Sequence, residues 1–144
     1  MEEDKYQIIV SLTSWKGRIY DKSLLYNLFR LFHQETAIKY KVVLVLSEEE
    51  FPLKEKELPK ELVLFNKTID NFEILWTYKN TKALKKLNPT INKYPNLPII
   101  TLDDDTLLEK YVIDDLYNLN KKYPDRIITG NHPSFYNFFI KRIN

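Results

Sequence analysis

Three consecutive aspartates, Asp103-Asp104-Asp105, follow directly on the apolar run 98–102. In a strand, alternate side chains share a face, so Asp103 and Asp105 are expected to converge while Asp104 points elsewhere. Two converging carboxylates offer hard oxygen ligands that suit Mg²⁺ or Mn²⁺, and such an ion completes its shell with phosphate and water. The run therefore predicts a site for a divalent metal and a diphosphate, with Asp103 and Asp105 as the metal ligands.

The acidic run has three other interpretations: a solvated turn, an EF-hand loop and a receiver-type phosphoacceptor site. A solvated acidic turn at the start of the next helix explains one aspartate well and three poorly, and it remains the alternative. An EF-hand loop needs glycine at its sixth position, where Leu108 stands when Asp103 is counted first. A receiver-type phosphoacceptor site needs an acidic pair after the first strand, where Thr13 and Ser14 stand. The metal and diphosphate site is therefore the prediction.

Composition limits how such a diphosphate is held. The chain has 144 residues, 44% hydrophobic and 29% charged, which indicates one soluble globular domain. Its net charge of +2 is too balanced to predict nucleic-acid binding. Only two glycines occur, Gly17 and Gly130, so a Gly-rich phosphate loop or dinucleotide fingerprint is excluded. A bound phosphate would therefore depend on a metal ion and side chains.

The same inventory bears on redox chemistry and location. There are no cysteines, which excludes disulfides, thiolate zinc sites and cysteine nucleophiles. No signal peptide follows the acidic N-terminus, and no apolar run approaches the ~20 residues of a transmembrane helix. We therefore expect a cytoplasmic protein without a transmembrane segment, with peripheral contact to the inner face of the membrane as one form of this location.

Near-continuous apolar runs of strand length recur along the chain. We expect strands at 7–12, 41–46, 62–65, 72–76, 98–102 and 126–129. Such runs, alternating with helices, are typical of a mainly parallel sheet covered on both faces. The predicted fold is therefore α/β, a three-layer α/β/α sandwich. Ligands of these sheets bind at the carboxyl ends of the strands, where Thr13, Ser47 and Asp103 stand.

Helical segments are expected between the strands. Asp21 is placed to cap a helix that carries leucines at helical spacing up to Phe32. Residues 47–50 are typical of a short helical start, and Thr81 is placed to cap a helix that Pro89 interrupts or restarts. The segment 106–109 matches a capping box at the start of a helix that ends near Lys122. The last segment, 131–144, is expected to be an irregular aromatic tail.

The ordered set of segments resembles bacterial glycosyltransferases of the GT-A fold, near the family-2-like enzymes. The segments 8–14, 43–47, 79–87, 99–105 and 123–128 are similar to successive parts of the nucleotide-sugar-binding half. In that order they resemble the first strand and nucleotide-binding loop, the second strand, the helix beside the nucleotide, the Asp-x-Asp strand, and the turn into the next strand. The resemblance implies a nucleotide-sugar-binding domain over 1–130, with 131–144 as the start of an acceptor half.

The resemblance also implies an activity and roles for residues. It implies transfer of a sugar from a nucleotide-diphosphate donor to a surface-glycan or lipid-linked acceptor, with Mn²⁺ or Mg²⁺ as cofactor. Asp105 would bind the metal, and Asp103 would contact the metal or the ribose. The residues expected around the donor are Thr13 and Ser14 near the base or ribose, Arg18 and Lys86 at the diphosphate, and Asp103 and Asp104.

Simpler roles stay open for several of these side chains. Arg18 could pair with a surface carboxylate, and the lysines of 82–86 could form a solvated helix face. We expect Trp15 and Trp76 to be packing residues, although Trp15 could instead stack on a base or sugar. Glu50 and its neighbours are expected at a helix N-terminus, and His132 is expected at the surface. No residue is assigned as a catalytic base.

Three functional classes follow. The first is a metal-dependent glycosyltransferase, and the second is a module that binds a nucleotide-sugar without transfer, or complements a partner chain or a second copy. The third is a nucleotidyltransferase, which fits poorly because its first loop is usually Gly-rich and 13–18 holds only Gly17.

Overall fold

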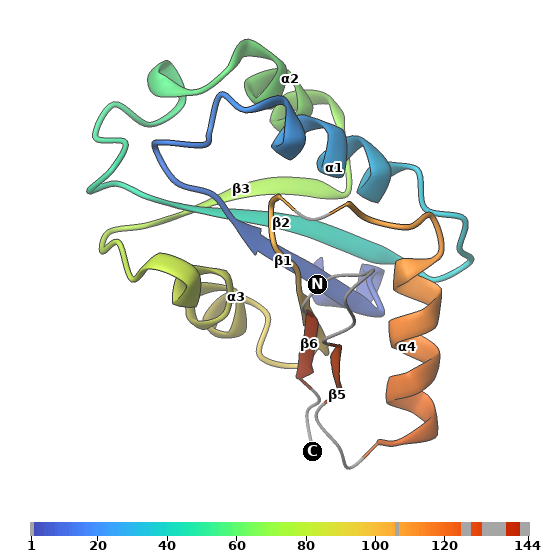
Figure 1. The fold of residues 1–144 in the computed structure, drawn as a ribbon. Helices are drawn as coiled ribbons and strands as arrows, with labels where there is room; N and C mark the ends of the chain where they lie inside the picture. Colours follow the sequence, from blue (N-terminus) through green and yellow to red (C-terminus); the bar gives the residue numbers. More distant parts are fainter. Residues whose placement is uncertain (1, 106, 125–127, 131–137, 142–144) are drawn as a thin grey trace.

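One six-stranded sheet organises the protein, whose computed structural model describes residues 2–105, 107–124, 128–130 and 138–141 (Figure 1). Four neighbouring strands are parallel: β1 (Ile8–Thr13), β2 (Tyr40–Ser47), β3 (Phe72–Thr77) and β4 (Ile99–Thr101). Beyond β4, β6 (Phe138–Lys141) runs antiparallel and pairs in turn with β5 (Ile128–Gly130). The strand order is β3-β2-β1-β4-β6-β5.

Helices cover both faces of the sheet, as the sequence predicted for an α/β/α sandwich. In Figure 1, α1 (Lys22–Phe32) and α2 (Lys60–Thr68) lie on one side, and α3 (Asn88–Lys93) lies on the other with the preceding 3₁₀ turn η3 (Lys82–Lys86). The helix α4 (Val112–Lys122) packs into the same core cluster as α1. Two short 3₁₀ turns, η1 (Glu2–Lys5) and η2 (Lys54–Glu57), complete the elements.

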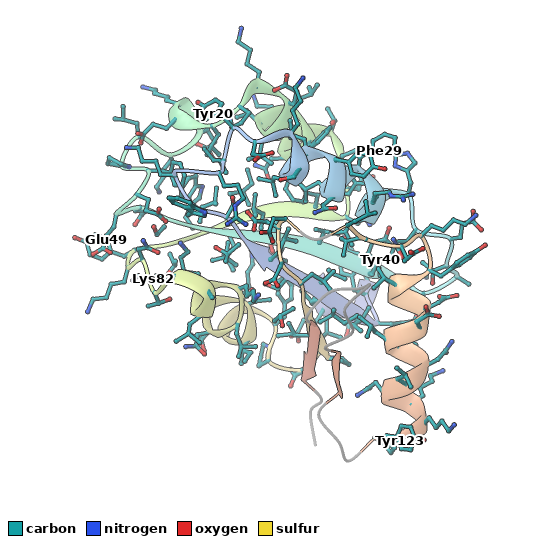
Figure 2. The ribbon with its side chains drawn as sticks, in the orientation of Figure 1. Tyr20, Phe29, Tyr40, Glu49, Lys82 and Tyr123 are labelled. Atoms are coloured by element: carbon teal, nitrogen blue, oxygen red, sulfur yellow. The ribbon has the colours of Figure 1, made fainter. Side chains whose placement is uncertain are left out.

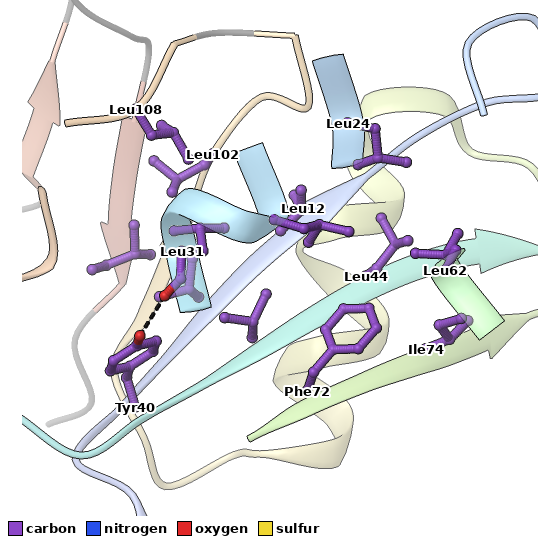
Figure 3. Close-up of a cluster of buried hydrophobic side chains, with 14 of the residues drawn as sticks. Leu12, Leu24, Leu31, Tyr40, Leu44, Leu62, Phe72, Ile74, Leu102 and Leu108 are labelled. Carbon is purple, nitrogen blue, oxygen red and sulfur yellow. Dashed lines mark hydrogen bonds between the residues drawn. The ribbon is translucent and has the colours of Figure 1, made fainter. Parts of the chain in front are cut away.

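Strand alternation divides the core into two layers. Leu12 and Leu44 point toward α1 and α2, where they join one large cluster of buried side chains (Figure 3). Ile9 and Val43 point to the opposite face, where they pack with Tyr94, which follows α3. Both faces are thus buried, which is why the central strands β1 and β2 are mostly apolar.

The chain reverses its direction of sheet growth between β1 and β4. It extends outward from β1 to β2 and β3, and then crosses back to place β4 on the other side of β1. Such a reversal opens a crevice beyond the carboxyl ends of the two central strands. The backbone N–H of Leu102 donates to the Ser11 carbonyl at 3.0 Å, so the pairing of β4 with β1 continues up to the first aspartate.

Four of the expected strands are confirmed, at 7–12, 41–46, 72–76 and 98–102, whereas the strand expected at 62–65 is wrong. That run lies in α2, where Leu62 is buried and Leu64 is 56% exposed. A run of four apolar residues fits a strand or a helix equally well, and the structure places only one side of it against the core. The helical start expected at 47–50 is also wrong, because 48–50 form a turn after β2.

The expected helix boundaries have mixed outcomes. Asp21 caps α1 by accepting a hydrogen bond from the Ser23 N–H at 2.9 Å, as predicted. The segment after Thr81 is a 3₁₀ turn without a side-chain cap, and α3 restarts with Pro89 in its first turn. The capping box at 106–109 is wrong, because α4 begins only at Val112; position 106 itself lies outside the described residues.

The C-terminal segment is only partly described. Of the strand expected at 126–129, residues 128 and 129 lie in β5, and 126 and 127 lie outside the described residues. The irregular tail expected over 131–144 is wrong for Phe138–Lys141, because backbone pairing with β4 makes this segment a strand. Within the described parts of the chain, no helix combines the length and the apolar character needed to cross a membrane.

Candidate functional site

A cavity of about 520 Å³ lies beyond the carboxyl ends of β1 and β4. The loop after β1, the turn after β2, the turn η3 and the aspartates after β4 all contribute to its walls. The residues predicted around a donor and a metal all line it: Thr13, Ser14, Arg18, Lys86, Asp103, Asp104 and Asp105. Residues that lie up to about 90 positions apart in the chain therefore meet at one site.

Asp104 is the innermost of the three aspartates, with 6% of its surface exposed. Its carboxylate accepts hydrogen bonds from the Ser14 hydroxyl at 2.7 Å and from Arg18 Nη1 at 2.9 Å. Its backbone carbonyl accepts from the Asn27 side-chain amide of α1 at 2.9 Å. Burial raises the pKa of the Asp104 carboxyl above its ordinary value, and the bonds from Ser14 and Arg18 offset this only in part. Asp104 therefore fastens the acidic turn to the β1 loop and α1.

The acidic run does not continue the strand, because β4 ends at Thr101 and both Asp104 and Asp105 lie in a turn. As expected, Asp104 still points apart from its neighbours: it is buried, whereas Asp105 is exposed. Asp104 points inward, and Asp105 shares Arg18 with it at 2.7 Å. Asp103 faces a different cation, Lys86, whose Nζ lies 2.6 Å from its Oδ1. Whether Asp103 and Asp105 ligate a metal stays a prediction.

The two cations predicted at the diphosphate already pair with the three aspartates of the acidic turn. Arg18 binds both Asp104 and Asp105, so its partners include a buried carboxylate as well as an exposed one. Lys86 binds Asp103, and the exposed fractions of the two side chains are 18% and 35%. Both cations also line the cavity, where an incoming anion can reach them.

Thr13 and Ser14 reach the site from the end of β1, but their hydroxyls already have partners. Thr13 Oγ1 donates to the Val45 carbonyl at 2.7 Å and thereby ties the end of β1 to β2. Ser14 Oγ donates to Asp104. Their exposed atoms line the cavity, while their hydroxyls fix its wall.

A further ion pair, between Lys85 and Glu50, was not predicted from the sequence. Lys85 is 1% exposed and donates to Glu50 Oε1 at 2.8 Å and to the Asn80 side-chain carbonyl at 2.7 Å. Glu50 also accepts from the backbone N–H of Lys16 at 3.1 Å and from the Ser47 hydroxyl at 3.3 Å. The expectations of a solvated face for Lys85 and a helix N-terminus for Glu50 are therefore wrong.

The charge on Glu50 is stabilised by these contacts. Burial by itself raises its pKa, but the hydrogen bonds from Lys85 and the Lys16 N–H and the charge of Lys85 together bring the pKa below its ordinary value. The pair therefore joins the loops after β1 and β2 to η3. No pattern in a single sequence relates positions 50 and 85, so only the fold reveals them as partners.

Trp15 lies half exposed at the cavity, so its expected packing role is wrong. A Cβ added at Gly17 would lie 2.2 Å from two carbons of the Trp15 ring, far inside van der Waals contact. Gly17 is therefore the residue that allows the ring to lie against the loop. Trp76, by contrast, packs against the main core cluster as expected, edge-on to Phe51.

Replacing Gly17 with alanine is expected to displace the Trp15 ring toward solvent, because the new methyl group and the ring cannot occupy the same space. In a Trp76→Phe background, where Trp15 is the single tryptophan, the emission maximum should move to longer wavelength. Iodide quenching should rise in parallel. Unchanged emission and quenching in the Gly17→Ala protein would contradict this placement of the ring.

Charges of both signs balance around the cavity. Among the described lining residues there are four anionic side chains, Glu50 and the three aspartates, and four cationic ones. Arg18, Lys85 and Lys86 each pair with an anion. Lys82 on η3 is exposed, has a positive φ of 56°, and makes no ion pair with any described residue (Figure 2). The described lining residues thus carry no net charge in total. Lys82 is the cation among them that can pair with a ligand without breaking an ion pair between described residues.

The donor set suits a metal that needs few protein ligands. Among the described residues, no cluster of three or more histidine, aspartate or glutamate side chains is arranged around a common ion position. Magnesium typically takes one or two protein carboxylates and fills its remaining positions with phosphate and water. Asp103 and Asp105 are carboxylates of the kind that such an ion binds, and their role as ligands stays a prediction; His132 lies outside the described residues.

Comparison with protein-family models and with curated proteins finds no match to this chain. The resemblance to GT-A enzymes therefore rests on the sequence segments alone.

Proposed function

We propose that this chain binds a nucleotide-diphosphate sugar together with Mg²⁺ or Mn²⁺ and serves as the donor-binding part of a glycosyltransferase. The observation that supports this most directly is the cavity at the β1–β4 reversal, where the acidic turn and the basic residues meet. In open α/β sheets this is the position where ligands bind.

The diphosphate is assigned to the cavity by its cations. Arg18, Lys86 and Lys82 all line it, and Lys82 has no ion-pair partner among the described residues. There is no Gly-rich loop to supply backbone donors. Without such a loop, a diphosphate depends on side-chain cations and a metal ion for its counter-charge.

Charge balance favours a metal and a nucleotide sugar entering together. The charges of the described lining residues already sum to zero, so a diphosphate alone would leave the cavity negatively charged. The diphosphate of a nucleotide sugar carries as much negative charge as a divalent ion carries positive charge. The two ligands therefore occupy the cavity without changing its net charge, which limits the electrostatic cost of binding.

Roles for individual residues follow from their positions. Asp103 and Asp105 would hold the metal, which when bound stabilises a diphosphate leaving group. Asp104 keeps the acidic turn in place through Ser14 and Arg18. Trp15 offers a half-exposed planar ring at the cavity to the base or the sugar. The acceptor in this proposal is a surface glycan or a lipid-linked sugar, which would bring the chain to the cytoplasmic face of the membrane.

Thermal unfolding tests donor binding. Mn²⁺ with UDP or GDP is expected to raise the melting temperature by about 5 °C, because a ligand at a large excess over its dissociation constant stabilises the folded state. Asp105→Ala should abolish the rise. Asp70→Ala is the matched control, because Asp70 is exposed beside the start of β3, at the opposite end of the strands. No metal-dependent rise with any nucleoside diphosphate would exclude the proposal.

Transfer requires its own measurement. Metal-dependent release of the nucleoside diphosphate from a nucleotide sugar, in the presence of the purified chain, is expected if the chain carries out transfer or hydrolysis. Binding without any release would restrict the function to donor binding, in which case transfer would depend on a partner chain or a second copy.

A further inference from the structure

The two cations of the acidic turn are held in different ways. Arg18 Nη1 contacts Asp104 at 2.9 Å and Asp105 at 2.7 Å. Among the described residues, Lys86 makes one ion pair, with Asp103, and both partners are partly exposed to solvent. The structure thus contains one cation, Arg18, bound to a buried carboxylate and another, Lys86, bound to a partly exposed carboxylate.

Arg18 cannot leave without a large cost. Its departure would leave the Asp104 carboxylate, with 8% of its side chain exposed, without a counter-charge, and an unpaired buried charge is strongly unfavourable. Lys86 can leave at a lower cost, because 35% of the Asp103 side chain is exposed and water can solvate the carboxylate that is left behind. Its flexible stem also lets the ammonium group move while the backbone stays in place.

We propose that Lys86 is an exchanging cation, an inference that rests on the proposed function. In the empty cavity it neutralises Asp103. When a divalent metal takes Asp103, the ammonium group of Lys86 passes to the diphosphate, which enters the same cavity. Arg18 remains on Asp104 throughout.

The exchange couples the two ligands. Metal binding frees Lys86 for the diphosphate, and diphosphate binding removes Lys86 from Asp103 and so exposes a metal ligand. By linkage, each ligand raises the affinity of the other by the same factor. Without the metal, Asp103 competes with the diphosphate for Lys86, so metal-free nucleotide binding is weakened by an acidic residue inside the site.

This competition gives a sharp test. With EDTA present to remove metal, Asp103→Asn is expected to bind UDP about fivefold more tightly than the native protein, because Lys86 is released from its ion pair. Isothermal titration calorimetry measures the affinity. The double variant Asp103→Asn/Lys86→Gln should bind UDP no more tightly than Lys86→Gln, because the gain requires the freed lysine.

A matched variant separates exchange from a general charge effect. Asp105→Asn removes the same charge from the same acidic turn, but the partner of Asp105 is Arg18, which stays on Asp104. Any gain in UDP affinity in Asp105→Asn should therefore persist in the Lys86→Gln background. Mn²⁺ titrated alone should bind Lys86→Gln about fivefold more tightly than native protein, and Lys82→Gln, which removes an unpaired cation, should not show this gain.

The outcomes are separable. Equal gains for Asp103→Asn with and without Lys86, or equal Mn²⁺ affinities for Lys86→Gln and native protein, would overturn the exchange while leaving donor binding intact. Failure of native protein to bind UDP even with Mn²⁺ would exclude the proposed function and the exchange with it.

Discussion

Glu50→Ala is expected to lower the free energy of unfolding by about 3 kcal/mol, because it leaves the buried ammonium group of Lys85 without its counter-charge. Lys85 is 1% exposed, and its remaining partner would be the neutral Asn80 side chain. The variant also removes the acceptor for the Lys16 N–H and the Ser47 hydroxyl. Urea denaturation of the native and variant proteins measures the difference.

Two further variants show whether the lost charge is the cause. Glu50→Ala/Lys85→Met removes both charges and should recover part of the stability, because an apolar side chain of similar length replaces the stranded cation. Glu61→Ala, at an exposed position on α2, is expected to change stability by less than about 0.5 kcal/mol. A Glu50→Ala protein as stable as Glu61→Ala would contradict the buried ion pair.

The contribution of Glu50 also has a defined pH dependence. Its pKa in the folded protein is lowered from the ordinary value of 4.5, because the bonds and charge of Lys85, with the Lys16 N–H, outweigh the effect of burial. A lowered pKa means that the stabilisation is complete above that ordinary value and is lost as the pH falls through the folded-state pKa. The stability difference between native protein and Glu50→Ala should therefore shrink on acidification below about pH 4.5.

Asp104→Ala is expected to cost about 2 kcal/mol of unfolding free energy and to disorganise the cavity wall. The Ser14 hydroxyl loses its acceptor, and Arg18 loses the inner of its two carboxylates. Among the described contacts, the Asn27 amide would still hold the Asp104 backbone carbonyl to α1, and Arg18 would still hold Asp105. Urea denaturation gives the stability loss, and nucleotide binding gives the effect on the cavity.

Asp104→Asn separates the shape of this group from its charge. Asparagine keeps an oxygen for the Ser14 hydroxyl. It also avoids the burial of a charge, and this burial is what raises the pKa of Asp104 in the native protein. It should therefore lose less stability than Asp104→Ala, while Arg18 keeps Asp105 as a partner. Equal losses in the two variants would mean that the Ser14 bond contributes nothing to holding the turn.

These two residues connect stability to the site. Glu50 joins the loops after β1 and β2 to η3, and Asp104 joins the acidic turn to the β1 loop and α1. Each is a buried or partly buried anion held by a cation that also lines the cavity. The cavity wall is thus maintained by internal ion pairs, and a ligand must either leave these pairs intact or replace them.

Much of the fold could be predicted from local patterns. The apolar runs of β1, β2 and β4 are long and continuous enough to be identified as buried strands, and Asp21 was recognised as a helix cap from its residue type and position. The structure of the run at 62–65 was not predicted correctly, because four apolar residues are too few to show the period of a helix or of a strand. Its helical form depends on which of its sides meets the core, and that is decided by packing.

The sequence by itself determined that polar residues follow the buried strands at 13–14 and 103–105. In a parallel sheet this places them at one edge, which is why Thr13, Ser14 and the three aspartates line one cavity. Only the tertiary structure decided which of them pair. Asp104 lies inward beyond the end of β4 and pairs with Ser14 and Arg18, and Lys85 pairs with Glu50 from a distant segment. Such pairings join segments that lie far apart in the chain, so they leave no periodic pattern in the sequence. Burial then makes them strong.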